Sequence, residues 1–281
     1  PRIVAQGINS VTWLPGSRLV TEWQAAVDTA VARINAGELD KVVLARDIVA
    51  QLDEPLHIGA LLIRLNESFP ECWTFCVDGL VGATPELLIR RDGEHVTSRV
   101  LAGTMRRSRD TDRDGQLAAE LLDSNKDQEE HVYAVESVAA ALATHCTDLN
   151  VPKSPFILRL ANVQHLATDV TGELVDAAPA LALAASLHPT AAVCGTPTER
   201  ATHVIKELEG MDRGRYSAPV GWLAANGDGE FGIALRCALI ETDDRKTLRL
   251  FAGCGIVAGS NGESEVAESQ AKFAAMKSAL E

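Results

Sequence analysis

The sequence has no apolar run long enough to cross a membrane as a helix, since none reaches 18 residues. It also lacks paired cysteine motifs: none of the six cysteines forms C-x-x-C or stands beside a histidine at zinc-ligand spacing. Most of these cysteines lie inside apolar stretches, where a thiol behaves as a small buried hydrophobe. We therefore expect a cytoplasmic protein without a membrane partner.

A surplus of positive charge is also missing. The chain has 39 acidic residues against 26 Lys and Arg, which gives a net charge of -13. A nucleic-acid partner is not expected, because binding the phosphate backbone requires an excess of cations. An acidic protein can still bind an acidic small molecule if a few local cations or a metal ion reverse the field.

The chain is long enough for a large core, with 281 residues of which 46% are hydrophobic. Strands come in groups joined by tight turns, and helices separate the groups. This order predicts an α+β fold with largely antiparallel sheets rather than a βαβ array. Because no linker or repeat is visible, we treat residues 1–281 as one domain. The start "PRIVAQG" has no initiator Met and opens inside a pattern, so we expect a missing N-terminal segment.

Hydrophobic periodicity and turn signals predict the individual elements. Helices are expected at 21–40 (ending near Gly37), 57–69, 115–145, 179–187, 196–210 and 263–280. Strands are expected at 41–52 and 162–170, in a hairpin of 218–225 with 230–241, at 247–253, and as short strands within 72–104. Thr196, Pro197 and Glu199 predict a capping box at the start of the helix over 196–210.

Two predicted helices carry carboxylates on one face. Asp123, Asp127 and Glu130 follow the spacing i, i+4, i+7, and Glu265, Glu268 and Lys272 follow i, i+3, i+7. If the helices met, their oxygen-only ligands would suit Mg²⁺. The alternative is two solvated helix faces, with the glutamates from Glu263 onward simply favouring a helix N-terminus. Spacing alone leaves both interpretations open.

Two basic residues lie in small apolar surroundings. Lys41 begins a strand on the face of Val43 and Ala45, where desolvation would lower its pKa and make it a base. The alternative is a lysine that extends to water. Arg236 is predicted in mid-strand on a face of small residues, with room for a carboxylate ligand, or else on an exposed sheet face.

Ordered motifs resemble the chorismate-utilising enzymes, which include isochorismate, salicylate, anthranilate and aminodeoxychorismate synthases. The motifs are "KVVLAR", "GATPELLIRR", "LAGTMRR", "KDQEEH", "QHLAT", "LHPTAAVCGTP", "YSAPVGW", "ALRCALI", "FAGCGIV" and "ESEVAESQAKF". They run from about residue 38 to the end. The resemblance implies two large, mostly antiparallel sheets packed as a sandwich, with helices outside and the site in the cleft between them. It also implies that residues 1–281 form a chorismate-binding catalytic domain.

The resemblance also implies roles for individual residues. Lys41 resembles the base that activates water, and Glu86 the acid that protonates the departing hydroxyl. Glu130 and Glu268 resemble direct Mg²⁺ ligands, with Asp127 and Glu265 in support; family members more often have Glu at the position of Asp127. The remaining implied substrate contacts are Arg236, Tyr216 and the backbone near Gly253 for the pyruvyl carboxylate, Lys272 as a second cation, Gly103 and Thr104 for the ring, and His165 near the ring carboxylate.

Within the family, Lys41 resembles the members that use water, since those that use ammonia have Ala or Gln there. No docking element for a glutamine amidotransferase subunit is recognisable, and we expect a monomer. "LHPTAAVCGTP" resembles isochorismate synthases, and salicylate synthase is the alternative, because Tyr216 also suits that type. Outside catalysis, a binding module without activity or a nucleotide-binding protein is the other hypothesis.

Overall fold

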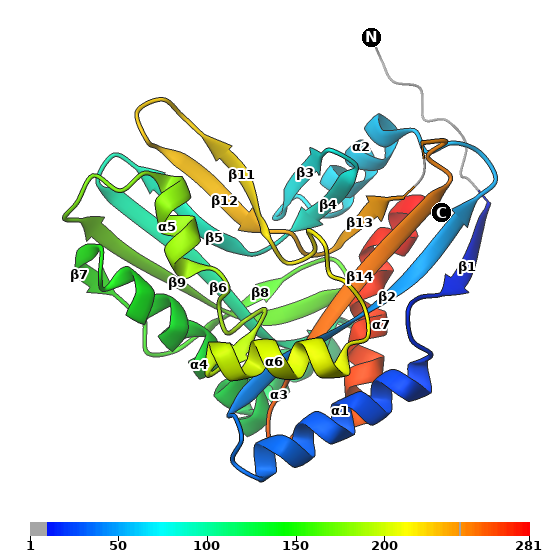
Figure 1. The fold of residues 1–281 in the computed structure, drawn as a ribbon, viewed down its shortest axis with the longest axis horizontal. Coiled ribbons are helices and arrows are strands. Elements are labelled where there is room, and N and C mark those ends of the chain that lie inside the picture. The colour runs from blue at the N-terminus through cyan, green and yellow to red at the C-terminus, as the bar shows by residue number, and fades with distance from the viewer. Residues whose placement is uncertain (1–9, 242) are drawn as a thin grey trace.

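The computed structural model describes residues 10–241 and 243–281, and within these residues the strands form two seven-stranded antiparallel sheets (Figure 1). The first contains β1 (Val11–Pro15), β2 (Lys41–Leu52), β3 (Trp73–Val77), β4 (Leu80–Thr84), β10 (Gly195–Thr196), β13 (Cys237–Ile240) and β14 (Thr247–Ile256). Its order is β1-β2-β14-β13-β4-β3, with β10 paired to β2. "PRIVAQG", from which we expected a missing segment, lies outside the described residues.

The second sheet contains β5 (Leu87–Asp92), β6 (His95–Arg106), β7 (Cys146–Asn150), β8 (Phe156–Arg159), β9 (Val163–Leu174), β11 (Pro219–Leu223) and β12 (Gly229–Ile233). Its order is β11-β12-β5-β6-β9-β7, with β8 paired to β9. The predicted α+β class with antiparallel sheets is confirmed.

Helices cover the sheets with their apolar faces. They are α1 (Val20–Asn35), α2 (Ile58–Ser68), α3 (Thr111–Asp123), α4 (Asn125–Leu142), α5 (Ala180–Leu187), α6 (Thr198–Leu208) and α7 (Gly262–Leu280). Helices α2 and α7 pack on the first sheet, α1 and α6 pack near the start of β2, and α4 and α5 pack on the second sheet (Figure 1). No helix in the described part of the chain is long and apolar enough to cross a membrane.

Strand β14 shows how one strand serves two environments. Successive side chains of a strand point to opposite faces. Leu250 and Ala252 pack in the core with α7, whereas Phe251, Gly253 and Gly255 line the space toward the second sheet. The glycines in this alternation keep that space open between the sheets.

The helix predicted over 115–145 is two helices. It breaks at Ser124, whose backbone is extended and whose hydroxyl accepts a hydrogen bond from the N–H of Asp127, as an N-cap does. Asp123 is therefore the exposed last residue of α3, and our grouping of it with Asp127 and Glu130 was wrong. In the sequence, the helical pattern continues across this break, because Ser, Asn and Lys do not interrupt it.

The strand predicted over 230–241 is also two strands, and they belong to different sheets. β12 ends in the second sheet and β13 begins in the first, with Arg236 between them at a φ of 49°. Our placement of Arg236 in mid-strand was wrong. The apolar pattern hid the crossing because Ala234 and Cys237 on either side of it are fully buried.

The predicted capping box is absent. Thr196 pairs with Lys41 across β10 and β2, and α6 begins at Thr198 after Pro197, with no side-chain cap hydrogen bond. The other predicted helices and strands occur within a few residues of their expected bounds.

Candidate active site

A pocket lies between the two sheets. The first sheet contributes Val43 and Phe251–Gly253 with Gly255, and the second contributes Leu101–Thr104 and His165. Its empty volume is about 650 Å³, counting the part open to solvent. Pockets of roughly 300–1,000 Å³ hold small organic molecules, so one ring-sized ligand fits.

Arg236 enters this pocket from the crossing between the sheets. It is 8% exposed, so it is neither on an open sheet face nor solvated. Its Nη2 lies 2.9 Å from Nε2 of His165. Burial lowers the pKa of Arg236, yet a guanidinium remains charged at neutral pH, so the pocket contains a fixed cation with free donors.

His165 orients Arg236. Because Arg236 can only donate, Nε2 of His165 must accept, which places the ring proton on Nδ1. That proton is donated toward the Gly103 carbonyl at 3.2 Å, and Thr104 Oγ1 lies 3.1 Å away. Burial, with Arg236 and Lys272 nearby, holds the pKa of His165 well below its usual value. The imidazole is therefore neutral and anchors the guanidinium.

Gly103 permits the close approach of α4 to β6. Its φ is 77°, and an added Cβ would lie 3.0 Å from the Cβ of Asp127. A side chain here would push α4, with its carboxylates, away from the pocket.

Tyr216 and Lys272 lie around Gly253. An added Cβ at Gly253 would lie 3.0 Å from the Tyr216 hydroxyl, so glycine leaves that hydroxyl room. Tyr216 stacks on Phe251 with ring centroids 5.0 Å apart, and burial raises its pKa, which keeps the phenol protonated. The Lys272 Nζ donates to the Gly253 carbonyl at 2.8 Å and to Glu268 at 2.5 Å.

Lys41 is fully buried rather than extended to water. Its Nζ donates to the Glu130 carbonyl oxygen at 3.2 Å and lies 3.6 Å from the Glu130 carboxylate. Burial lowers its pKa, and Glu130 and Glu86 only partly oppose this. Glu130 lines the pocket, whereas Lys41 is not among the residues that line it.

Glu86 lies between β4 and β5 and does line the pocket. It is 4% exposed, and burial raises its pKa to about 8, although Lys41 and Lys272 pull in the other direction. At neutral pH most molecules therefore hold a protonated Glu86. A general base requires a neutral amine and a general acid requires a protonated carboxyl. The lowered pKa of Lys41 and the raised pKa of Glu86 favour these forms.

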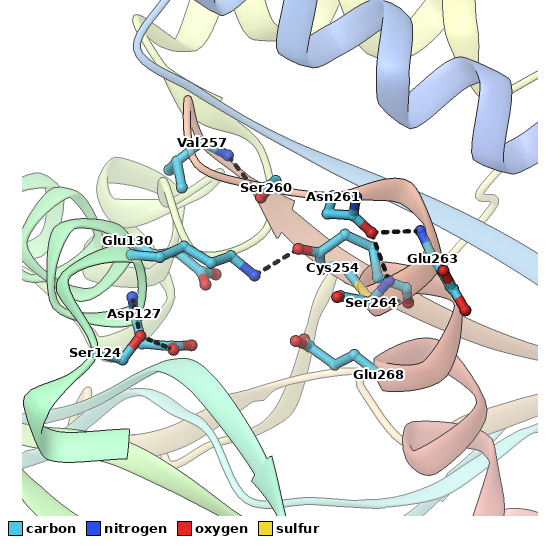
Figure 2. A network of polar contacts seen from close by, with 12 residues as sticks. Ser124, Asp127, Glu130, Cys254, Val257, Ser260, Asn261, Glu263, Ser264 and Glu268 are labelled. Atoms are coloured by element: carbon cyan, nitrogen blue, oxygen red, sulfur yellow. Dashed lines mark hydrogen bonds and ion pairs between the residues drawn. The ribbon is translucent and has the colours of Figure 1, made fainter. Parts of the chain in front are cut away.

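The carboxylates of α4 and α7 face a shared space. Figure 2 shows Glu130 and Glu268 directed toward it from opposite sides, with Asp127 nearby. Asp127, Glu130 and Glu265 are buried, so the interpretation as solvated helix faces does not hold for them. Glu263, in contrast, is exposed and sits in the first turn behind the Asn261 cap.

Gly255 makes room for Glu130. An added Cβ at Gly255 would lie 2.0 Å from Glu130 Oε1, so any other residue would displace this carboxylate. Two lysines contact the carboxylates of α7: Lys126 Nζ lies 2.5 Å from Glu265, and Lys272 contacts Glu268. Burial would raise the pKa of Glu268, but Lys272 and Lys126 outweigh it and lower the pKa.

The donor set fits a hard divalent cation. Within the described part of the chain, Oε2 of Glu265 is buried without a hydrogen-bond partner, which is rare for a carboxylate unless a ligand belongs there. The carboxylates of Glu265 and Glu268 and the thiol of Cys254 lie within 4.8 Å of one another. Glu265 and Glu268 of α7 therefore form a candidate metal site beside the pocket, and Glu130 of α4 faces the same space.

Known proteins resemble this chain over most of its length. The family described as "Chorismate binding enzyme" matches residues 16–281. The chain belongs to this family. Isochorismate synthase DhbC of Bacillus subtilis is 42% identical over 92% of the chain and 67% of that protein. Isochorismate synthase MenF of the same organism is 40% identical over 92% of the chain and 55% of that protein.

A solved structure of the same family shares the fold. The crystal structure of DhbC from Bacillus anthracis matches with a TM-score of 0.91 and 38% identity, over 98% of this chain and 75% of that one. The chain thus spans between about half and three quarters of these relatives. The predicted membership of the chorismate-binding enzymes is confirmed.

Sequence reasoning missed an ion pair at the pocket. Arg213 lines the pocket, forms an ion pair with Glu209 and donates to the Val43 carbonyl at 2.9 Å. Glu209 accepts from the Ala45 N–H at 2.7 Å. Together they satisfy backbone groups of Val43 and Ala45, in the stretch of β2 between its pairings with β10 and β1. The i, i+4 spacing of Glu209 and Arg213 was the available signal, but it does not reveal the distant partner.

Proposed function

We propose that this chorismate-binding enzyme is an isochorismate synthase. It would convert chorismate reversibly to isochorismate, with salicylate synthase as the alternative. The observation that carries the proposal is the opposed tuning of Lys41 and Glu86 beside one pocket. The names of the relatives favour the same activity. The chain spans 55–67% of those proteins, so its own activity has to be measured directly.

The substrate is a dianion, and the pocket has cations to receive it. Arg236, held by His165, would form paired hydrogen bonds to the pyruvyl carboxylate, together with the Tyr216 hydroxyl and the backbone near Gly253. Lys272 would add a second positive charge. Gly103 and Thr104 would lie against the ring. These local charges reverse the field of a protein with a net charge of -13.

The reaction requires one proton transfer at each end of the ring. Lys41 would accept a proton from water as its oxygen forms a bond to C2. The ring double bonds shift, the C4–O bond breaks, and Glu86 would donate its proton so that the hydroxyl departs as water. Because Lys41 does not line the pocket, the attacking water would have to reach both its Nζ and the substrate.

The metal of this site would be Mg²⁺, since its donors are oxygens. Glu130 and Glu268 would hold it, with Asp127 and Glu265 in support. When bound, it would neutralise the ring carboxylate of the substrate. We further propose a monomer of one catalytic domain that works without a glutamine amidotransferase subunit.

Product analysis tests the activity. Incubated with chorismate and Mg²⁺, the chain is expected to accumulate isochorismate, as measured by chromatography against standards. Dominance of salicylate and pyruvate would instead identify a salicylate synthase. Absence of turnover, with chorismate binding retained in calorimetry, would identify a binding module.

Removal of the metal is expected to abolish turnover. With EDTA, the carboxylates near the ring would repel the substrate carboxylate, and we expect a loss on the order of a hundredfold or more. Added Mg²⁺ should restore the rate. Unchanged turnover in EDTA, with residual Mg²⁺ excluded by elemental analysis, would contradict the proposed metal site.

A further inference from the structure

A cysteine thiol lies against the carboxylates of α7. Cys254 is fully buried on β14, and its Sγ donates to the backbone carbonyl of Glu265 at 3.4 Å. Its sulfur and one oxygen each of Glu265 and Glu268 lie within 4.8 Å of one another. Figure 2 shows Cys254 on the Glu268 side of the shared space, opposite Glu130.

A second observation points to a ligand at this position. Glu265 is fully buried, and only its Oε1 is paired, with Lys126. Its Oε2 has no hydrogen-bond partner among residues 10–241 and 243–281. A buried carboxylate oxygen costs free energy unless a donor or a cation contacts it, so the cluster has unused capacity for a cation.

We propose that Cys254, Glu265 and Glu268 form a site for a thiophilic divalent cation such as Zn²⁺ or Cd²⁺, overlapping the proposed Mg²⁺ site. Thiolate sulfur selects soft or borderline ions and does not suit Mg²⁺. The inference rests on the proposed function only in that the two ions share Glu265 and Glu268. A thiophilic ion there would exclude Mg²⁺ and inhibit the enzyme.

The geometry requires an adjustment of up to about an ångström. In a tetrahedral zinc site with bond lengths of roughly 2.3 and 2.1 Å, the sulfur and an oxygen lie about 3.6 Å apart. The three donor atoms of Cys254, Glu265 and Glu268 now lie within 4.8 Å of one another. Rotation of the two glutamate side chains would have to close the difference.

Binding of the ion releases one proton. The metal–sulfur bond forms as the Cys254 S–H bond breaks, and the proton is released to solvent. Lys126 and Lys272 would give up their carboxylates to the ion. The Lys126 side chain is 25% exposed, so it can turn toward water without crossing the core.

Cadmium titration of the metal-free protein tests the site without substrate. Thiolate bonded to Cd²⁺ has a charge-transfer absorption in the ultraviolet. We expect Cys254→Ser to lack one equivalent of this absorption and to bind Cd²⁺ at least tenfold more weakly. Cys237→Ser is the matched control, because Cys237 is equally buried but its thiol donates to the Ala234 carbonyl rather than to the carbonyl of a proposed ligand. It should behave like the original chain.

Competition separates this proposal from the proposed function. Added Mg²⁺ should weaken Cd²⁺ binding in the original chain whether or not chorismate is turned over. If Cys254→Ser and Cys254→Ala, both folded by circular dichroism, keep the full absorption and affinity, the site does not exist. Equal loss in Cys237→Ser would also overturn it, because the effect would then come from the core and not from Cys254.

Discussion

Lys41→Ala is expected to lower kcat by about 10²–10⁴, the contribution of a positioned base. The fully buried amine lies beside Glu130, and burial lowers its pKa so that a neutral form is available. The fold should survive, because removing a desolvated ammonium also removes its desolvation cost. Steady-state kinetics with chorismate measures the first effect, and thermal unfolding measures the second.

The control for this substitution is Lys206→Ala. Lys206 is exposed on α6 and should leave kcat unchanged. The acid limb of the pH profile provides a further readout, because protonation of Lys41 should lower kcat/KM as the pH falls. A Lys41→Ala rate within a few-fold of the original would remove Lys41 from the mechanism.

Glu86→Gln is expected to lower kcat by a similar factor of about 10²–10⁴, because the amide retains the shape but has no acidic proton to donate. Glu263→Gln, on an exposed carboxylate of α7, is the matched control. The measured quantities are kcat and the melting temperature. A nearly normal rate in Glu86→Gln would mean that another group protonates the departing hydroxyl.

The pH dependence follows from the same residue. With a pKa of about 8 in the folded chain, Glu86 binds its proton more tightly than in the unfolded chain. Activity that needs this proton should therefore fall as the pH rises through about 8. The free energy of unfolding should also fall as the pH rises from the pKa of unfolded Glu86 to about 8, because in this range the folded state binds the proton and the unfolded state does not. Glu86→Gln has no such proton, so its melting temperature should fall less over this pH range than that of the original chain.

Much of the fold was predictable because its signals are local. The strand over 41–52 has the predicted bounds, since its β-branched residues continue to the turn that ends it. The last helix, predicted at 263–280, begins only one residue earlier. The errors share one cause: at Ser124 and at Arg236 a pattern continues through a change of direction that only the tertiary partners impose.

The sequence by itself determined which chemical groups are available: an acidic chain with Lys41, Glu86, Arg236 and carboxylates at helical spacing. It could not determine their environment. Only the packing of two sheets buries Lys41 and Glu86, and burial moves their pKa values in opposite directions because each loses the hydration of its charged form. Only the tertiary structure brings α4 beside α7 and places Cys254 against Glu268, since contacts between residues so distant in sequence follow from the fold and not from any local pattern.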